Sequence, residues 1–335
     1  MQIRPTIVDI ARELNLHPST VSRALTGQGR VGQETKDLVF KKAVELGYNC
    51  NQVASSLRKG ITDTVGIVVP LINRSFFSNV ISGAESVLNP AGYNLVVCQT
   101  HDRKEDEIRV IRNLLRNQVA GMLVSHSLET TSPELLQRVS TNGVVLVQFD
   151  RAFEDLDGTT CVVNDNFYGA YVATKHMIES GYKRIGHLGG EFSSNIYADR
   201  LAGYRKALEE AGMEFDETII YTNSITRDKG FYNMAKALDK GCDALYCAGD
   251  YAALGVMEYA RHNNIKIPDD FGVVGTANET FAELINPSLT SVEQNARDMG
   301  IQAAEAFLAM REDKAPTNKK IVVPMKLIVR ESAKR

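Results

Sequence analysis

Three polar side chains near the amino terminus could together contact a nucleic acid. Thr20, Ser22 and Arg23 lie in a segment that starts at Pro18 and has Val21 as an apolar position. If this segment is helical, the three side chains project from faces away from Val21. Short hydroxyls suit phosphates or base edges, and an arginine can bridge O6 and N7 of guanine. The alternative is that Thr20 and Ser22 only cap the helix and Arg23 is a solvated surface charge.

The residues around this segment predict three short helices. Thr6 and Asp9 have the capping-box spacing, in which a hydroxyl accepts from the first turn and a carboxylate three residues on returns the bond. Pro18 suits the first position of a second helix. Residues 34–46 are predicted to form the third helix, which Gly47 closes.

Ala11, Asn15 and Val21 have the spacing of a helix-turn-helix. The small Ala11 side chain lets the second helix cross the first closely, and Val21 packs beneath the crossing. Asn15 tolerates the left-handed backbone of a tight turn. The pattern favours a DNA-binding head, although three-helix heads with incidental packing also occur.

The charge distribution agrees with this interpretation. The 335 residues carry a net charge of −3, but residues 1–60 hold nine basic and five acidic side chains, a charge of +4. A basic head on an acidic body is typical of a nucleic-acid module fused to a larger domain. We expect no membrane span and no signal peptide, because no apolar run is long enough. Five irregularly spaced cysteines indicate a reducing, cytoplasmic location rather than a disulfide framework.

After residue 60 the pattern changes to alternating strands and helices. Apolar strand-like runs occur at residues 65–69, 95–97, 121–124, 144–147, 161–163, 185–188, 244–247 and 273–275. Most are separated by amphipathic helices, which indicates βαβ units and parallel sheets covered on both faces. Two such series fit into residues 61–335, so we expect two doubly wound subdomains. Their ligand site is expected in a cleft beyond the carboxyl ends of the strands.

The sequence contains no constellation of residues that indicates catalysis. The phosphate-binding, nucleophile-elbow and zinc-protease motifs are absent. Cys242 and Cys247 have no matching Cys or His pair for zinc, and the six histidines are scattered. We therefore predict no catalytic residue, no metal site and no cofactor.

Polar and aromatic residues at the predicted strand ends indicate a binding cleft instead. Phe76 and Phe77 follow the first strand and could stack on a sugar or base ring. Directional polar contacts are predicted for Asp150, Arg151, Asn164, Asp165 and Arg200. Asp250 opens a helix, so it is interpreted either as a ligand contact or as the helix N-cap.

The chain resembles the LacI/GalR family of bacterial transcription regulators along nearly its whole length. In the head, the resemblance lies in residues 6–11, 19–25, 35–49 and 54–58. In the body, it lies in residues 165–166, 200–204, 250–255 and 287–292.

For the head, the resemblance implies that Pro18, Ser19 and Arg23 reach into the major groove of DNA. It places Thr6, Thr20 and Ser22 at positions that contact the DNA backbone or cap helices. Two departures from the family could weaken the head: Asn15 stands where glycine is frequent, and His17 where a serine N-cap is usual.

For residues 51–60, the resemblance implies a hinge helix that orders on DNA and enters the minor groove together with a second copy. Leu57 would be the apolar wedge that unstacks a base step, and Arg58 a phosphate or groove contact. Cys50 stands where the family commonly has proline, which could loosen the hinge. The alternative is an ordinary linker with one incidental leucine.

For the body, the resemblance implies that Arg200 clamps the effector; the alternative is a surface ion pair. Many relatives carry an effector-binding Asp where this chain has Ala277. Asn278 or Glu279 is predicted to substitute for that carboxylate. No particular effector can therefore be transferred from a relative.

We therefore expect an α/β protein with a helix-turn-helix head (1–50), a hinge helix (51–60) and a periplasmic-binding-protein-like body (61–335). The body's subdomains are predicted at about 61–163 with 293–322, and about 164–292 with 323–335. The expected function is that of a homodimeric cytoplasmic repressor. It would bind an operator with an approximate inverted repeat and respond to a small-molecule effector, a sugar or sugar derivative. The alternatives are a cytoplasmic sugar-binding protein and an α/β enzyme with an incidental helical head.

Overall fold

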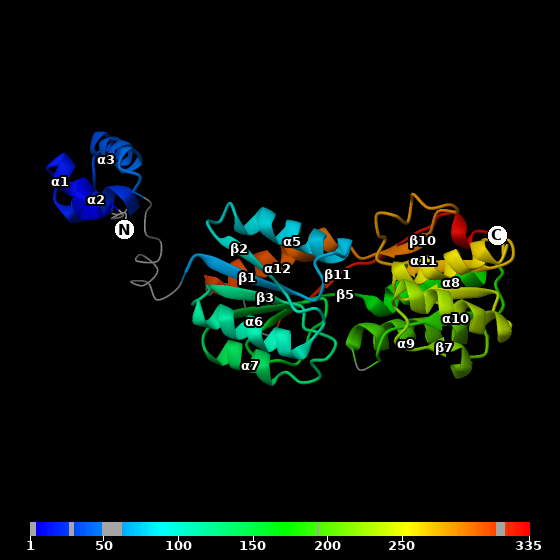
Figure 1. The fold of residues 1–335 in the computed structure, drawn as a ribbon. Coiled ribbons are helices and arrows are strands. Elements are labelled where there is room, and N and C mark those ends of the chain that lie inside the picture. The colour runs from blue at the N-terminus through cyan, green and yellow to red at the C-terminus, as the bar shows by residue number, and fades with distance from the viewer. Residues whose placement is uncertain (1–4, 27–29, 49–61, 193, 313–318) are drawn as a thin grey trace. The chain divides into compact units, whose positions relative to one another are not determined.

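The computed structural model describes residues 5–26, 30–48, 62–192, 194–312 and 319–335. The chain forms two compact units, Met1–Thr62 and Asp63–Arg335. The smaller unit, drawn in blue in Figure 1, contains the helices α1 (Ile7–Leu14), α2 (Pro18–Thr26) and α3 (Gln33–Glu45). Cys50 and the predicted hinge helix of residues 51–60, with Leu57 and Arg58, lie outside the described residues.

The predicted capping box begins α1. The Asp9 backbone N–H donates to Thr6 Oγ1 at 3.4 Å, and the Thr6 backbone N–H donates to Asp9 Oδ2 at 2.8 Å. The Thr6 hydroxyl also donates to Asp9 Oδ2 at 2.6 Å. This bond first, and then the bond from the Thr6 backbone N–H, lower the pKa of the Asp9 carboxyl below its usual range. The box satisfies N–H groups that the first helical turn leaves without partners.

The helix-turn-helix spacing is confirmed. Ala11 and Val21 are 3% and 0% exposed, and Asn15 ends α1 in the left-handed conformation, with φ at +52°. The three helices share one small core, formed by Ile10, Ala11, Val21, Ala24, Val39 and Ala43. Because this core fixes α2 from below, the helix presents its polar face outward.

His17 does part of the capping that a serine would do at the start of α2. The Ser19 backbone N–H donates to His17 Nδ1 at 3.3 Å, and Ser19 Oγ lies 2.8 Å from the same nitrogen. An unprotonated Nδ1 accepts both bonds. The departure from the family's serine therefore leaves α2 with a side-chain acceptor at its first turn.

The larger unit contains two six-stranded sheets. The first is parallel throughout, and its strands lie in the order β11 (Lys319–Val323), β5 (Thr160–Asn164), β4 (Val145–Phe149), β3 (Gly121–Val124), β1 (Thr64–Val69) and β2 (Asn94–Gln99). In its centre, Val65 of β1 pairs with Gly121 of β3. The central strands are buried, as expected of a parallel sheet with helices on both faces.

The second sheet repeats this design. Its strand order is β12 (Lys326–Ile328), β10 (Thr290–Glu293), β9 (Gly272–Thr276), β8 (Ala244–Cys247), β6 (Ile185–Leu188) and β7 (Ile220–Tyr221). Only β12 runs antiparallel to its neighbour. The two sheets confirm the predicted pair of doubly wound α/β subdomains.

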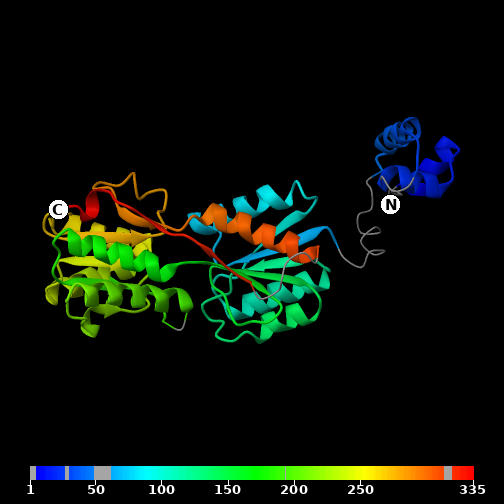
Figure 2. The ribbon, with the colours of Figure 1, turned by 180° about the vertical axis from the view of Figure 1, so that it is seen from behind.

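Helices cover both faces of each sheet (Figures 1 and 2). On the first sheet, α5 (Ser75–Leu88) and α12 (Ala296–Arg311) cover one face, and α6 (Lys104–Arg116) and α7 (Glu134–Thr141) the other. On the second, the pairs are α8 (Asn166–Glu179) with α9 (Asn195–Glu210), and α10 (Arg227–Asp239) with α11 (Asp250–His262). Two short 3-10 turns span Glu217–Ile219 and Glu331–Ala333.

At Gly83, a Cβ would lie 2.1 Å from the Arg297 carbonyl oxygen, so only glycine lets α5 and α12 pack this closely.

The chain passes between the two sheets three times. It leaves the first sheet after β5, returns after β10 and leaves again after β11. All eight strand-like runs predicted from the sequence form strands, whereas β7, β10, β11 and β12 were not predicted. No helix in the described part of the chain is both long and apolar enough to cross a membrane.

Candidate functional site

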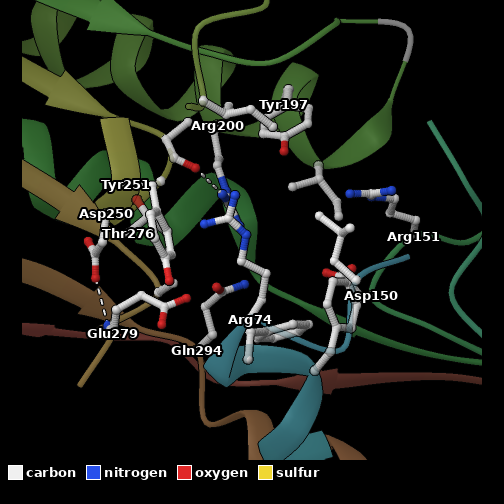
Figure 3. A pocket seen from close by; sticks show the side chains of 18 of the residues that line it. Arg74, Asp150, Arg151, Tyr197, Arg200, Asp250, Tyr251, Thr276, Glu279 and Gln294 are labelled. Carbon is white, nitrogen blue, oxygen red and sulfur yellow. Dashed lines mark hydrogen bonds between the residues drawn. The ribbon is translucent and has the colours of Figure 1, made fainter. Parts of the chain in front are cut away.

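A cavity in the larger unit collects residues that follow the strands of both sheets. From the first sheet come Leu71 after β1, Asp102 after β2 and Asp150 after β4; from the second come Thr276 and Gln294 at the ends of β9 and β10. The first turns of α5, α9 and α11 complete the lining (Figure 3). The cavity volume is about 140 Å³, and the cavity is open to solvent. Apolar side chains and a few polar groups directed at one space are typical of a site for a small molecule.

Arg200 reaches this cavity from α9 and is held by neutral acceptors. Its Nε donates to Asn166 Oδ1 at 2.9 Å, and one Nη donates to the Ala248 carbonyl at 2.7 Å. The side chain is 5% exposed and lies 5.8 Å from the centre of the Tyr197 ring. The surface ion pair that the sequence left open is therefore wrong. Arg200 is a buried, oriented cation facing the cavity.

Asp150 and Arg151 lie together at the end of β4. Arg151 forms an ion pair with Asp102 and donates to the His126 carbonyl at 3.3 Å. Asp150 accepts from Ser125 Oγ at 3.2 Å, and its backbone φ of +60° turns the chain sharply at this point. Burial raises the pKa of the Asp150 carboxyl even though the charges of Arg151 and Arg200 act to lower it.

Asp250 joins three elements of the second subdomain. Its carboxylate accepts from the Glu279 backbone N–H at 2.7 Å and from Ser291 Oγ at 2.7 Å. At Gly275 a Cβ would lie 2.0 Å from Asp250 Oδ1, so β9 needs glycine there to admit the carboxylate. Burial raises the pKa of Asp250 to about 6. The N-cap interpretation is wrong, because Gly249 is the N-cap and Asp250 is the first helical residue.

Two contacts connect the subdomains across the cavity. Ser75 Oγ at the start of α5 donates to Glu279 Oε2, with 2.5 Å between the oxygens. Beside it, the guanidinium of Arg74 lies 3.7 Å from the centre of the Tyr251 ring. Figure 3 shows Arg74 extending from α5 into the middle of the cavity, next to Tyr251. Glu279 thus lies in the cavity as predicted, although its carboxylate already has a protein partner.

Three residues predicted to contact a ligand do not line the cavity. Asn164 donates to the Gln294 carbonyl at 2.8 Å and so fixes one of the chain crossings. Asp165 is exposed and caps α8 by accepting from the Tyr168 N–H at 2.9 Å. Asn278 donates to Glu293 and accepts from Arg330, both at 2.8 Å. Their polar atoms serve the backbone and the C-terminal segment instead.

The aromatic prediction differs in detail. Phe76 and Phe77 line the cavity, but they are only 8% and 6% exposed and pack edge to face, with 5.1 Å between ring centres. Sequence reasoning missed the cavity residues Arg74, Asp102, Tyr197, Tyr251, Thr276 and Gln294. The available signal was position: Arg74 directly precedes α5, and Tyr197 lies one turn before Arg200 on the same helix.

The polar face of α2 is the second candidate site. Ser19 and Arg23 are exposed, Pro18, Thr20 and Ser22 are half-buried, and Val21 between them is buried. Thr6 is exposed at the start of α1, where its hydroxyl is engaged in the capping box. A helix with this face fits the major groove of B-DNA.

Comparisons with known proteins match both the head and the body of the chain. The family model described as bacterial regulatory proteins, lacI family, matches residues 6–51, and that of a periplasmic binding protein-like domain matches residues 174–333. The HTH-type transcriptional regulator RegA of Clostridium saccharobutylicum is 33% identical over 332 residues, 98% of this chain and 98% of RegA. The chain belongs to the lacI family of bacterial regulatory proteins.

Two further proteins show how far this similarity extends. The HTH-type transcriptional repressor PurR of Vibrio campbellii (strain ATCC BAA-1116) is 32% identical over 333 residues, 98% of this chain and 99% of PurR. The solved complex of the transcriptional regulator CelR with cellobiose superposes with a TM-score of 0.75 at 30% identity, over 98% of this chain and 100% of CelR.

This lacI-family protein is a DNA-binding transcription regulator with an effector-binding domain, and it is not an enzyme. The relatives that match along its whole length are regulators, which removes the enzyme alternative. The free sugar-binding protein is removed for the same reason, because the match to the family includes the helix-turn-helix. Among the described residues, no group of three or more His, Cys, Asp or Glu side chains could hold a metal ion.

Proposed function

We propose that this protein is a cytoplasmic repressor that binds operator DNA as a homodimer and changes its operator affinity when a sugar or sugar derivative occupies the cavity. The observation that carries the proposal is Arg200, a buried cation that neutral acceptors orient toward the cavity. A guanidinium supplies five N–H donors in a fixed plane, which suits vicinal hydroxyls or an acidic group. The CelR complex supports a carbohydrate, since cellobiose is the ligand bound there.

DNA contact is assigned to the head. We assign Pro18, Ser19 and Arg23 to the major groove, and Thr6, Thr20 and Ser22 to backbone contacts. The predicted minor-groove contacts, Leu57 and Arg58, stay proposals that lie outside the described residues. In a symmetric dimer each head reads one half-site, so the operator is expected to be an approximate inverted repeat.

Pairing of two copies is supported by an exposed apolar edge of the first sheet. β2 has a neighbour on one side only, and its Val96 and Val97 are 42% and 44% exposed. Ile72, after β1, is 51% exposed. Edge strands with apolar side chains are costly to leave in water, and a second copy would cover them.

The effector response can be separated from DNA binding by changing Arg200. An operator is first selected from randomised duplexes with the full chain, and binding is then followed by fluorescence anisotropy with and without cellobiose and other sugars. We expect Arg200→Ala to bind the operator like wild type but to lose the response to the sugar that acts on wild type. An effector shifts DNA affinity only through its different affinities for two body conformations, so removing a main contact removes the shift.

Arg205→Ala is the matched control, because Arg205 lies on the same helix but is exposed and bonds to Glu209 at 2.9 Å. It should keep the response. An Arg200→Ala protein that still responds fully would refute the assigned contact. Loss of operator binding in that variant would show a structural role instead.

A further inference from the structure

Two positively charged side chains in the cavity lack a carboxylate partner. The Arg200 guanidinium bonds only to an amide oxygen and a backbone carbonyl. Among the residues that the structure describes, the Arg74 guanidinium makes no hydrogen bond or ion pair and stacks on the Tyr251 ring. No ion pair with a described carboxylate involves either guanidinium. Figure 3 shows both side chains directed into the middle of the cavity, from opposite subdomains. Arg200 is buried and Arg74 is half-buried. A buried cation without a counterion is unfavourable, so this place is suited to an anion.

The carboxylates that line the cavity are committed elsewhere. Asp102 is paired with Arg151. Asp250 accepts two bonds within its own subdomain, and Glu279 accepts from Ser75. These three acidic groups therefore leave the charges of Arg74 and Arg200 uncompensated.

Asp150 is the remaining carboxyl of the lining, and it does not pair with either arginine. It is 7% exposed and bonds to Ser125 Oγ at 3.2 Å. Burial raises the pKa of its carboxyl, and the charges of Arg151 and Arg200 act in the opposite direction. A carboxyl at this place suits a ligand hydroxyl as its hydrogen-bond partner.

We propose that the effector carries an anionic group, a carboxylate or a phosphate, that Arg74 and Arg200 bind together. This proposal rests on the proposed effector site and names the chemical class that it accepts. The face of Arg74 is stacked on Tyr251, which leaves the in-plane N–H groups for the ligand. Planar guanidinium groups bind carboxylates and phosphates through paired hydrogen bonds. Asp150 would bond to the hydroxyls of the same ligand. A sugar acid or a sugar phosphate carries both kinds of group.

The anion site is tested with probes that do not require the effector to be known. Inorganic phosphate and acetate are titrated into the full chain at constant ionic strength, and thermal unfolding is followed by scanning calorimetry. The proteins are wild type, Arg74→Gln, Arg74→Lys and the control Arg103→Gln. Arg103 is exposed and pairs with exposed Glu105, away from the cavity. All four proteins have the same head, so any effect of phosphate bound to the head is the same in each of them and does not alter the comparison.

We expect at least one anion to raise the unfolding temperature of wild type and Arg103→Gln in a saturable way. Arg74→Gln should lower the affinity for that anion at least tenfold. Arg74→Lys should lower the affinity less, because the positive charge is retained. A larger effect of phosphate indicates a sugar phosphate, and a larger effect of acetate a sugar acid. The proposal is wrong if Arg74→Gln reduces the rise in unfolding temperature for neither phosphate nor acetate.

Ring-bearing probes add a second readout. D-glucuronate and D-glucose 6-phosphate carry the two anionic groups on the ring of D-glucose, which is neutral. If D-glucose stabilised wild type and Arg74→Gln equally, the anion assignment would also be wrong. Operator binding is measured in parallel: an anion that binds through Arg74 without changing operator affinity refutes the proposed function and leaves the anion site intact.

Discussion

The hydroxyl of Ser75 donates to the carboxylate of Glu279, with 2.5 Å between Ser75 Oγ and Glu279 Oε2. This bond connects the first turn of α5 to the loop after β9, and so connects the two subdomains across the cavity. Arg74 reinforces it by stacking on Tyr251. Residues 74 and 75 therefore each contribute a contact between the two sides of the cavity.

Ser75→Ala is expected to shift the body toward more open conformations. A hydrogen bond to a charged group contributes about 1.5–3 kcal/mol net, and this one joins parts that move relative to each other when such clefts open. Hydrogen exchange measured by mass spectrometry should increase in peptides that cover residues 279–285. Ser86→Ala is the control, because Ser86 bonds to the Gly83 carbonyl within the same helix. Equal exchange in both variants would show that the Ser75 bond does not hold the cleft.

The central strands could be predicted from the sequence because their side chains are buried on both faces. β1 and β3 read as unbroken apolar runs for this reason. The missed strands β11 and β12 lack that signal. β11 begins with the exposed Lys319 and Lys320, and β12 has three residues, of which Lys326 is exposed. An edge strand pairs with one neighbouring strand and is exposed to solvent on its other side, so its sequence resembles that of a loop.

The cavity was predicted in its location but only partly in its residues. Strand ends identified Asp150, Arg151 and Asp250, because carboxyl ends of parallel strands meet at one edge. Position alone could not separate Asn164, which faces the chain crossing, from Arg200, which faces the cavity. Such a distinction depends on three-dimensional contacts between segments far apart in the sequence.

Arg23→Ala should remove base discrimination at one position of each half-site. Arg23 is exposed on α2, and a bidentate arginine–guanine contact is worth about 1–3 kcal/mol. Affinity is measured for the selected operator and for variants changed one base pair at a time. Arg12→Ala, on the exposed face of α1, is the comparison, and it should affect all sequences alike. If Arg23→Ala also weakens every sequence equally, Arg23 contacts a phosphate.

Ala277→Gly should stabilise the body. Ala277 lines the cavity with φ at +118°, a region that side chains with a Cβ rarely adopt. The strain of about 1–3 kcal/mol exceeds the roughly 0.5–1 kcal/mol that the freedom of glycine costs. We expect a gain of about 1 kcal/mol in urea unfolding. Ala235→Gly, inside α10, should instead lose about 0.5–1 kcal/mol. A loss at both positions would show that residue 277 is not strained.

Asp250→Asn should change how stability depends on pH. Burial raises the pKa of Asp250 from the ordinary 3.8 to about 6, so the folded protein holds this proton more tightly than the unfolded chain does. Stability from this group is therefore greatest below pH 4, falls as the pH rises toward 6, and is constant above that. The difference between the two pKa values corresponds to roughly 3 kcal/mol.

The free energy of unfolding in urea is measured for both proteins from pH 4 to 7.5 by circular dichroism. Relative to Asp250→Asn, wild type should lose up to roughly 3 kcal/mol across this range, because asparagine has no proton to release. Ser291→Ala removes a hydroxyl that bonds to Asp250 Oδ1 and lowers its pKa. In that variant the decline should extend to higher pH. Parallel curves for wild type and Asp250→Asn would mean that Asp250 is already ionised at pH 4 and that its bonds to Ser291 and Glu279 outweigh its burial.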